Sequence, residues 1–296
     1  MRRLIINADG YGFTEGVTRA IEECVAAGTV KSVSVLANFP LSEGITRLRE
    51  KYPDVSVGCH LNPVVGRPLL PPERVPSLVD ESGEFLHRRF LERLRDGSVR
   101  PGELREELTA QVDRVRAIAG SNFTHVDFQQ GIENQPRLYP VFLEIAQASG
   151  VGRIRTHKYH FGLHTESPGL RHGAYLLWPP VRLAKYVYNV RLRRIAKKRG
   201  LAMPDLTVSG NFLSGQAGGL CLENYLTILR NLPSGTVELI AHPAYVDESL
   251  RRWSTYLQPR EKERQVLLDP TFRESLRQSG IQLAGYRDIP LCERAA

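Results

Sequence analysis

The sequence lacks a long apolar run: no stretch of about 18 uncharged apolar residues occurs in its 296 positions, so no transmembrane helix is predicted. Its four cysteines are scattered, and no two of them form a Cys-x-x-Cys pair. This spacing disfavours a zinc–thiolate site and is typical of a reduced intracellular protein. The amino-terminal Met-Arg-Arg runs directly into a strand pattern without the features of a signal peptide. We therefore expect a cytoplasmic location.

Acidic residues are few relative to basic ones: 32 Asp and Glu accompany 40 Lys and Arg, which gives a formal net charge of +8. This excess favours anionic partners or substrates and carries no information about the fold. A phosphate-loop motif is also lacking, because the Gly-rich segment 214–219 has no Gly-Lys-Ser/Thr ending. The segment 214–219, part of a predicted loop at 209–219, is interpreted as a mobile substrate loop or an ordinary connection.

What is present is a regular alternation of strand and helix patterns. Apolar runs predict strands at 4–9, 32–36, 55–60, 124–128, 153–156, 206–208, 237–241 and 281–284. Helical spacing predicts helices at 14–28, 41–52, 104–118, 136–148 and 222–232, with Thr14 as the first N-cap and two short helices before the last strand. Seven or eight such units predict a TIM-barrel-like α/β barrel of parallel strands, as a single domain over 1–296.

Two segments interrupt this alternation. The proline-rich segment 63–101 is longer than a crossover needs and predicts a lid or a substrate-binding excursion. An insertion at about 159–205 contains a basic helix at 180–199, with eight Lys or Arg and no acid between 182 and 199. That helix could be a solvated helix packed on the barrel, a membrane-surface helix or a nucleic-acid contact, and no nucleic-acid-binding motif supports the last. After the predicted strand 153–156, around the start of the insertion, lies a group that could bind metal or a phosphorylated sugar, or serve mixed loop roles: His157, Lys158, His160, His164 and His172.

Polar side chains follow several of the predicted strands, namely Asp9, His60, Gln129, His157 and His242. A single aspartate at such a place can simply cap a turn, and a single histidine is more often a structural hydrogen-bonding group than a ligand. In a parallel barrel, however, the carboxyl ends of all strands meet at one face. Together these residues therefore predict one site at that face.

Five motifs resemble those of the YdjC-like carbohydrate deacetylases, which include the chitooligosaccharide deacetylases and the hopanoid-associated deacetylase. They are Ile6-Asn7-Ala8-Asp9 with Gly12, Gly58-Cys59-His60-Leu61-Asn62 with Gly66-Arg67-Pro68, Thr124-His125-Val126-Asp127, Ala241-His242-Pro243-Ala244 and Gly285-Tyr286-Arg287-Asp288. The resemblance extends over nearly the whole chain. It implies a TIM-barrel-like fold, a divalent metal (Mg or Zn), and a metal-dependent hydrolase that removes an N-acetyl group from an amino-sugar or glycolipid substrate.

The resemblance also implies roles for individual residues. Asp9 matches the catalytic base of the family, and His242, in the His-Pro-Ala segment, is expected to protonate the leaving amine. His60 matches a metal-binding histidine. The second aspartate of the family, a metal ligand, is matched by Gly10, and a second metal-binding histidine is matched by Gln129.

These two replacements bear on metal binding, because a divalent ion needs anionic or imidazole ligands to offset its dehydration. Weak binding is predicted unless other groups compensate. Asp9 could act as a ligand instead of a base, and Gln129 could provide its carbonyl oxygen. Asp127 or Glu133 could also turn towards the ion. The alternative function is therefore a catalytically inactive or repurposed family member that binds a glycan or glycolipid.

The remaining expectations concern substrate and partners. Asn62, Arg67, His157 and Arg287 are expected to bind the substrate. The segment 180–199 is a candidate for peripheral contact with the inner membrane surface, and a homodimer is left open. No nucleic-acid partner is expected.

Overall fold

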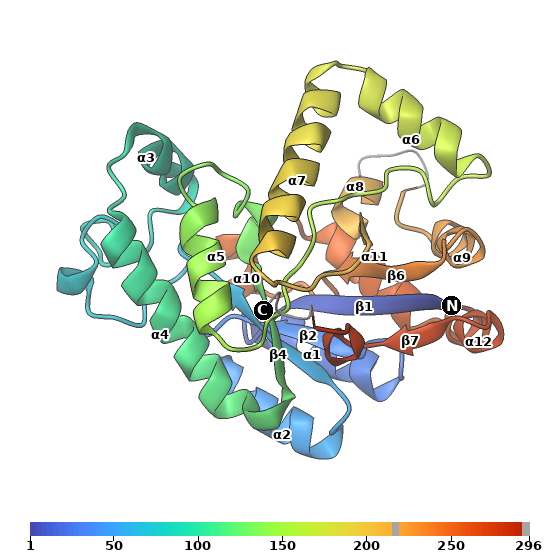
Figure 1. Cartoon of the computed structure of the whole chain (residues 1–296). Helices are drawn as coiled ribbons and strands as arrows, with labels where there is room; N and C mark the ends of the chain where they lie inside the picture. Colours follow the sequence, from blue (N-terminus) through green and yellow to red (C-terminus); the bar gives the residue numbers. More distant parts are fainter. Residues whose placement is uncertain (215–218, 292–296) are drawn as a thin grey trace.

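The computed structural model describes residues 1–214 and 219–291, and it contains a seven-stranded sheet in which every strand pairing is parallel. The strand order is β4-β3-β2-β1-β6-β5, with β7 beside β1 (Figure 1). The strands are β1 Arg2–Tyr11, β2 Ser32–Val35, β3 Ser56–Leu61, β4 Phe123–Phe128, β5 Leu206–Ser209, β6 Gly235–Ala241 and β7 Gln282–Ala284. These parallel pairings confirm the fold class predicted from the sequence, a parallel α/β barrel.

Strand β1 is the central element of the sheet. It pairs with β6 over residues 2–8, with β7 over residues 3–5 and with β2 over residues 7–11. Its residues from Leu4 onward are buried, as an apolar strand covered on both faces should be. Asp9 thus lies near the carboxyl end of a strand that neighbours hold on both edges.

The predicted strand at 153–156 is wrong in detail. This segment connects β4 to β5 through single-residue bridges, Val126 to Ile154, Arg153 to Ala202 and Tyr159 to Thr207. Its backbone changes partner within a few residues, so no continuous ladder forms. The segment nevertheless lies where a fifth strand would lie and joins the two edge strands of the sheet, which gives the barrel-like closure.

Helices surround the sheet, and none of those described is both long and apolar enough to cross a membrane. The predicted N-cap is confirmed, because the Thr14 hydroxyl accepts a hydrogen bond from the backbone N–H of Val17. The helices are α1 Glu15–Ala26, α2 Ile45–Lys51, α3 Phe90–Asp96, α4 Pro101–Ala119, α5 Tyr139–Ala148, α6 Pro168–Leu177, α7 Val181–Lys198, α8 Gly210–Ser214, α9 Leu222–Arg230, α10 Glu248–Trp253, α11 Gln258–Leu268 and α12 Pro270–Gln278.

Several predicted boundaries change. The helix predicted at 41–52 is a 3-10 turn, Pro40–Gly44, followed by α2. The insertion holds α6 as well as the predicted basic helix, and three helices rather than two follow β6. The stretch predicted as a loop at 209–219 begins with the end of β5 and with α8, and positions 215–218 lie outside the described residues. Turn residues inside these segments obscured the helical spacing.

Candidate active site

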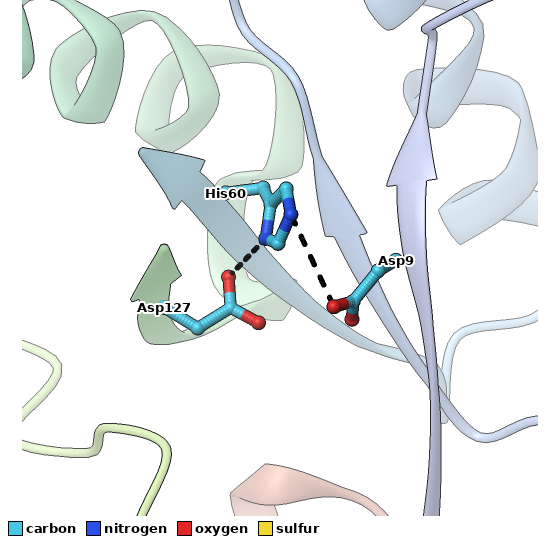
Figure 2. A group of neighbouring side chains, drawn as sticks. All are labelled: Asp9, His60 and Asp127. Atoms are coloured by element: carbon cyan, nitrogen blue, oxygen red, sulfur yellow. Dashed lines mark hydrogen bonds and ion pairs between the residues drawn. The ribbon is translucent and has the colours of Figure 1, made fainter. Parts of the chain in front are cut away.

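Three side chains converge from the ends of β1, β3 and β4, as Figure 2 shows for Asp9, His60 and Asp127. All three are buried. Nδ1 of His60 lies 2.8 Å from Oδ1 of Asp127, and its Nε2 lies 3.9 Å from Oδ2 of Asp9. One ligand atom from each residue falls within 4.8 Å of the others, so the group could hold a metal ion.

A buried arginine that the sequence analysis missed lies among these acids. Arg155 donates hydrogen bonds to both carboxylate oxygens of Asp9, at 2.8 and 2.7 Å, and its Nη2 lies 2.7 Å from Oδ2 of Asp127. Its Nε donates to Glu238 at 3.0 Å. Burial alone would raise the pKa of Asp9 and Asp127, but the Arg155 guanidinium and His60 hold both pKa values below the ordinary range.

The ring of His60 is fixed on both sides. Its Nδ1 contacts Asp127, and its Nε2 lies 2.8 Å from Oε1 of Gln129. Although burial opposes the charged ring, Asp127 and Asp9 raise the pKa of His60 above its ordinary value. A carboxylate behind one imidazole nitrogen is the usual way to orient the other nitrogen of a metal-binding histidine.

His242, from the segment after β6, approaches the same carboxylate oxygen of Asp9 as His60 does. Its Nε2 lies 3.8 Å from Oδ2 of Asp9, and its Nδ1 lies 3.6 Å from Oε2 of Glu263. Glu263 is fully buried, accepts a hydrogen bond from the backbone N–H of His242, and accepts another from the Tyr256 hydroxyl at 2.9 Å. A side chain at Gly210 would collide with it, because an ideal Cβ there would lie 1.9 Å from Oε1 of Glu263.

The structure therefore brings Asp9, His60, Gln129 and His242 to one face of the barrel. A cavity of about 440 Å³ opens beside them, with Gln129 and His242 in its lining. Among the described residues, the lining contains no acidic side chain and four arginines: Arg88, Arg251, Arg252 and Arg260. Trp253 and Tyr256 supply aromatic surface in the same lining.

Arg260 differs from the other three arginines because it is buried. Its Nε donates to the backbone carbonyl of Tyr256, whereas Nη1 has no hydrogen-bond partner among the described residues. Burial lowers the pKa of Arg260. A buried guanidinium nitrogen without a partner is costly.

Two residues predicted to bind substrate lie on the long connection after β3. Asn62 is fully buried and uses its amide to fold that connection: Nδ2 donates to Asn38 and to the Val65 carbonyl, and Oδ1 accepts from the N–H groups of Val64 and Val65. Arg67 is exposed and does not belong to the cavity lining. A contact between either residue and substrate stays a prediction.

His157 lies apart from the main cavity, in the lining of a second cavity of about 320 Å³ between α7 and the barrel. Its Nε2 is 3.4 Å from Oε1 of Glu133, and both side chains are buried. No hydrogen bond reaches either imidazole nitrogen or either carboxylate oxygen among the described residues. Both cavities include Gln130 in their linings, and in the same histidine-rich group the rings of His160 and His172 stack at 4.4 Å.

Arg287 is not brought to this face. Its guanidinium donates to the backbone carbonyls of Pro53 and Val55, which precede the start of β3. It therefore lies at the amino end of the strands, and the structure gives it a place in the scaffold rather than beside the predicted substrate. Although its motif follows a strand, β7 is short and ends at Ala284, opposite Ile5 in the first half of β1, so the residues after it do not reach the carboxyl ends of the longer strands.

Three important site residues carry a signal that the sequence analysis did not use. Arg155 and Glu238 are charged residues inside predicted apolar strands, and Asp127 lies within a third. Such a charge in a buried strand needs a partner of opposite sign. Glu263 carries no comparable signal, because helix α11 is rich in charged residues.

The fold and this site define the class: a parallel α/β barrel with a carboxylate–imidazole cluster at the carboxyl ends of its strands. The chain belongs to the YdjC-like protein family, whose model matches residues 3–278. A protein of Thermoanaerobacter pseudethanolicus named carbohydrate deacetylase is 31% identical over 287 residues, which cover 97% of this chain and 98% of that protein. A carbohydrate deacetylase of Geobacillus stearothermophilus is 30% identical over 289 residues, with the same coverage.

A solved structure supports the fold over the same extent. The crystal structure of an Enterococcus faecalis protein named for cellobiose-phosphate cleavage superposes with a TM-score of 0.72 and 26% identity. The match covers 96% of this chain and 97% of the other.

Proposed function

We propose that this protein is a carbohydrate deacetylase that hydrolyses the acetamide of an amino sugar with the help of a divalent metal. One observation carries the proposal: Oδ2 of Asp9 has Nε2 of His60 at 3.9 Å and Nε2 of His242 at 3.8 Å, beside the arginine-lined cavity. Relatives that cover nearly the whole chain and are named carbohydrate deacetylase support the reaction class.

The metal would be held by Asp9, His60 and Gln129, while Asp127, whose Oδ1 lies 2.8 Å from Nδ1 of His60, would orient that ring rather than bind the ion. Nε2 of His60 lies 2.8 Å from Oε1 of Gln129 and 3.9 Å from Oδ2 of Asp9, so an ion about 2.0–2.2 Å from each atom could be shared if it replaced the His60–Gln129 hydrogen bond. When bound, such an ion polarises a carbonyl and lowers the pKa of water. Gln129 supplies a neutral oxygen only, so we expect weaker binding than a second histidine would give.

The residues of this chain would handle the protons. Asp9 would accept a proton from the attacking water through the carboxylate oxygen that does not hold the ion, and His242 would donate one from Nε2 to the leaving amine. Glu263, 3.6 Å from Nδ1 of His242, would orient the ring, as a buried carboxylate does behind other catalytic histidines.

The substrate is proposed to be an amino sugar or glycolipid. A sugar ring can stack on Trp253, and its oxygens can accept hydrogen bonds from Arg260. A lipid-linked sugar would also fit a membrane-surface role for the segment 180–199.

The test combines metal analysis with acetate release from chitooligosaccharides and from amino-sugar lipids. We expect about one metal per chain after reconstitution, and metal and activity should both be lost in His60→Ala, because that variant removes the only imidazole among the three proposed ligands. Arg277→Ala, which changes an exposed residue of α12, is the control and should keep both. Activity that persists without metal in the parent would contradict the proposal.

A second candidate function, glycan binding without catalysis, is favoured by Arg155. Its guanidinium already neutralises both oxygens of Asp9, and Gly10, where the family pattern has an aspartate, offers no ligand. Retained binding of chitooligosaccharides with no metal and no acetate release would support this function. In that case Gln129→His should raise metal affinity by restoring an imidazole beside His60.

A further inference from the structure

Exposed apolar side chains gather on one segment, the α6–α7 segment (residues 168–199). Of the ten large hydrophobic residues that are exposed in the described part of the chain, seven lie between 170 and 195. Trp178 is 76% exposed, and Leu177 and Val181 are each 67% exposed. Single exposed hydrophobics are ordinary, but a contiguous group of them marks an interaction surface.

This apolar group lies at the far end of the segment. In Figure 1, α7 stands up from the barrel, and the turn that joins it to α6 lies at the top of the view. The exposed residues Leu177, Trp178, Val181, Leu183 and Val187 surround that turn and begin α7. We call residues 177–187 the apolar apex.

The other half of α7 is basic and anchored. It packs on the barrel through Leu192, Arg193 and Ala196, and the Leu192 carbonyl accepts a hydrogen bond from the Tyr139 hydroxyl. Arg193 donates to Thr156 and to the Pro204 carbonyl. The exposed bases of this half and of the C-cap of α7 are Arg191, Arg194, Lys197, Lys198 and Arg199, whereas the exposed Lys185 lies within the apolar apex; the segment 168–199 contains no acid.

We propose that the α6–α7 segment docks this protein on an anionic lipid bilayer. The apolar apex enters the boundary between headgroups and acyl chains, and the basic half of α7 contacts anionic headgroups. Because a helix rises about 1.5 Å per residue, Val187 and Lys198 lie about 16 Å apart along the axis. That spacing suits an apex buried about 5–10 Å deep with a basic band just outside it.

The chemistry favours lipid over nucleic acid. Phosphodiester chains would engage the basic half, but they offer nothing to bury Leu177, Val181 and Val187. An anionic bilayer satisfies both halves at once. The inference stands independently of the proposed deacetylase activity, because it concerns a surface away from Asp9 and His242.

The chain contains only two tryptophans, Trp178 and Trp253, so insertion of the apex can be observed directly. In a Trp253→Phe background, we expect the emission of Trp178 to shift to shorter wavelength with phosphatidylglycerol-containing vesicles, and brominated lipid to quench it. Pure phosphatidylcholine vesicles should have little effect. About 0.5 M salt should weaken binding at least tenfold, since it screens the headgroup charge.

Vesicle flotation of the full-length protein then tests the apolar apex and the basic half of α7 separately. Leu177→Ser with Val181→Ser, and separately Arg191→Gln with Arg194→Gln and Lys198→Gln, should each reduce binding to anionic vesicles about tenfold or more. The matched controls are Leu41→Ser, for an exposed apolar residue elsewhere, and Arg273→Gln with Arg277→Gln on α12. Thermal unfolding checks that every variant is folded.

Four outcomes would overturn the proposal. The first is that the parent does not bind anionic vesicles, and the second is that both variant sets float like the parent. The third is that single-stranded DNA binds through the same bases more tightly than vesicles, with no shift in Trp178 emission. The fourth is that Trp178 becomes buried in a dimer without lipid, as sedimentation would reveal.

Discussion

At the scale of single residues, Arg155 organises the charges of the site. It contacts Asp9, Asp127 and Glu238, three buried carboxylates on three different strands. Without it their mutual repulsion and burial would favour protonation, because an uncompensated charge in the interior is very unfavourable. Arg155 therefore keeps Asp9 ionised, and a metal at the same carboxylate must share it with this guanidinium.

Burial has a testable effect on the pKa of one carboxyl group, that of Glu133. Burial raises the pKa of Glu133 from an ordinary value of 4.5 to about 8, and it lowers the pKa of His157 to about 4. Between these values both groups are neutral, so their 3.4 Å contact is not an ion pair there. Unfolding releases the Glu133 proton in that range, so this group lowers the free energy of unfolding as pH rises from about 4.5 to about 8.

Glu133→Gln should therefore match the parent near pH 4.5 and become more stable than the parent as pH approaches 8. At about 1.4 kcal/mol per pKa unit, a gain of about 2–4 kcal/mol is expected at the upper end. Urea unfolding across this pH range measures it, with the acidic end as the internal reference. A difference that does not change with pH would contradict the neutral carboxyl.

At the scale of elements, β3 and β4 approach closely at a glycine. An ideal Cβ on Gly58 would lie 2.2–2.6 Å from three atoms of the His125 ring. That ring stacks on Tyr286 at 3.8 Å, and its nitrogens lie 3.2 Å from the Ser34 hydroxyl and 3.0 Å from the Thr124 hydroxyl. The ring cannot move away from β3 without losing these contacts.

Gly58→Ala should accordingly lower the free energy of unfolding by about 2–3 kcal/mol, as overpacking does in other cores. Urea unfolding at neutral pH measures the loss. Adding His125→Ala should recover part of it, because the second change removes the clashing ring and the two effects are then not additive. Gly169→Ala, where a Cβ meets nothing within 4 Å, is the control and should be neutral or stabilising.

Some strands and site residues of this protein can be predicted from the sequence, whereas others depend on contacts between distant segments. Apolar runs located β1, β3, β4 and β6. The position of polar residues directly after predicted strands located Asp9, His60 and His242. Both signals depend only on neighbours along the chain. The pairing of residues 153–159 depends on where β4 and β5 lie in space, and so does the placement of Arg155. Periodicity cannot reveal such partners, although an arginine in an apolar strand indicates that one exists.

At the scale of the whole molecule, the two ends of the barrel have different tasks. The carboxyl ends hold the cluster of Asp9, His60 and His242, whereas at the amino ends Arg287 ties the last segment to the residues before β3. Barrels generally separate chemistry and stability in this way. The two arginines Arg287 and Arg260 belong to opposite ends and allow the separation to be tested.

Arg287→Ala should lower the free energy of unfolding by about 1–3 kcal/mol, because two hydrogen bonds from a charged donor are lost. Chitooligosaccharide affinity and the KM for acetate release should stay unchanged, since the lost contacts are to the carbonyls of Pro53 and Val55. Arg260→Ala should instead weaken that affinity or raise that KM at least tenfold, because it removes the buried donor in the cavity lining. If Arg287→Ala strongly changed ligand affinity and left stability unchanged, Arg287 would have to contact the ligand. That result would contradict the assignment of ligand binding to the carboxyl ends and of stability to the amino ends of the strands.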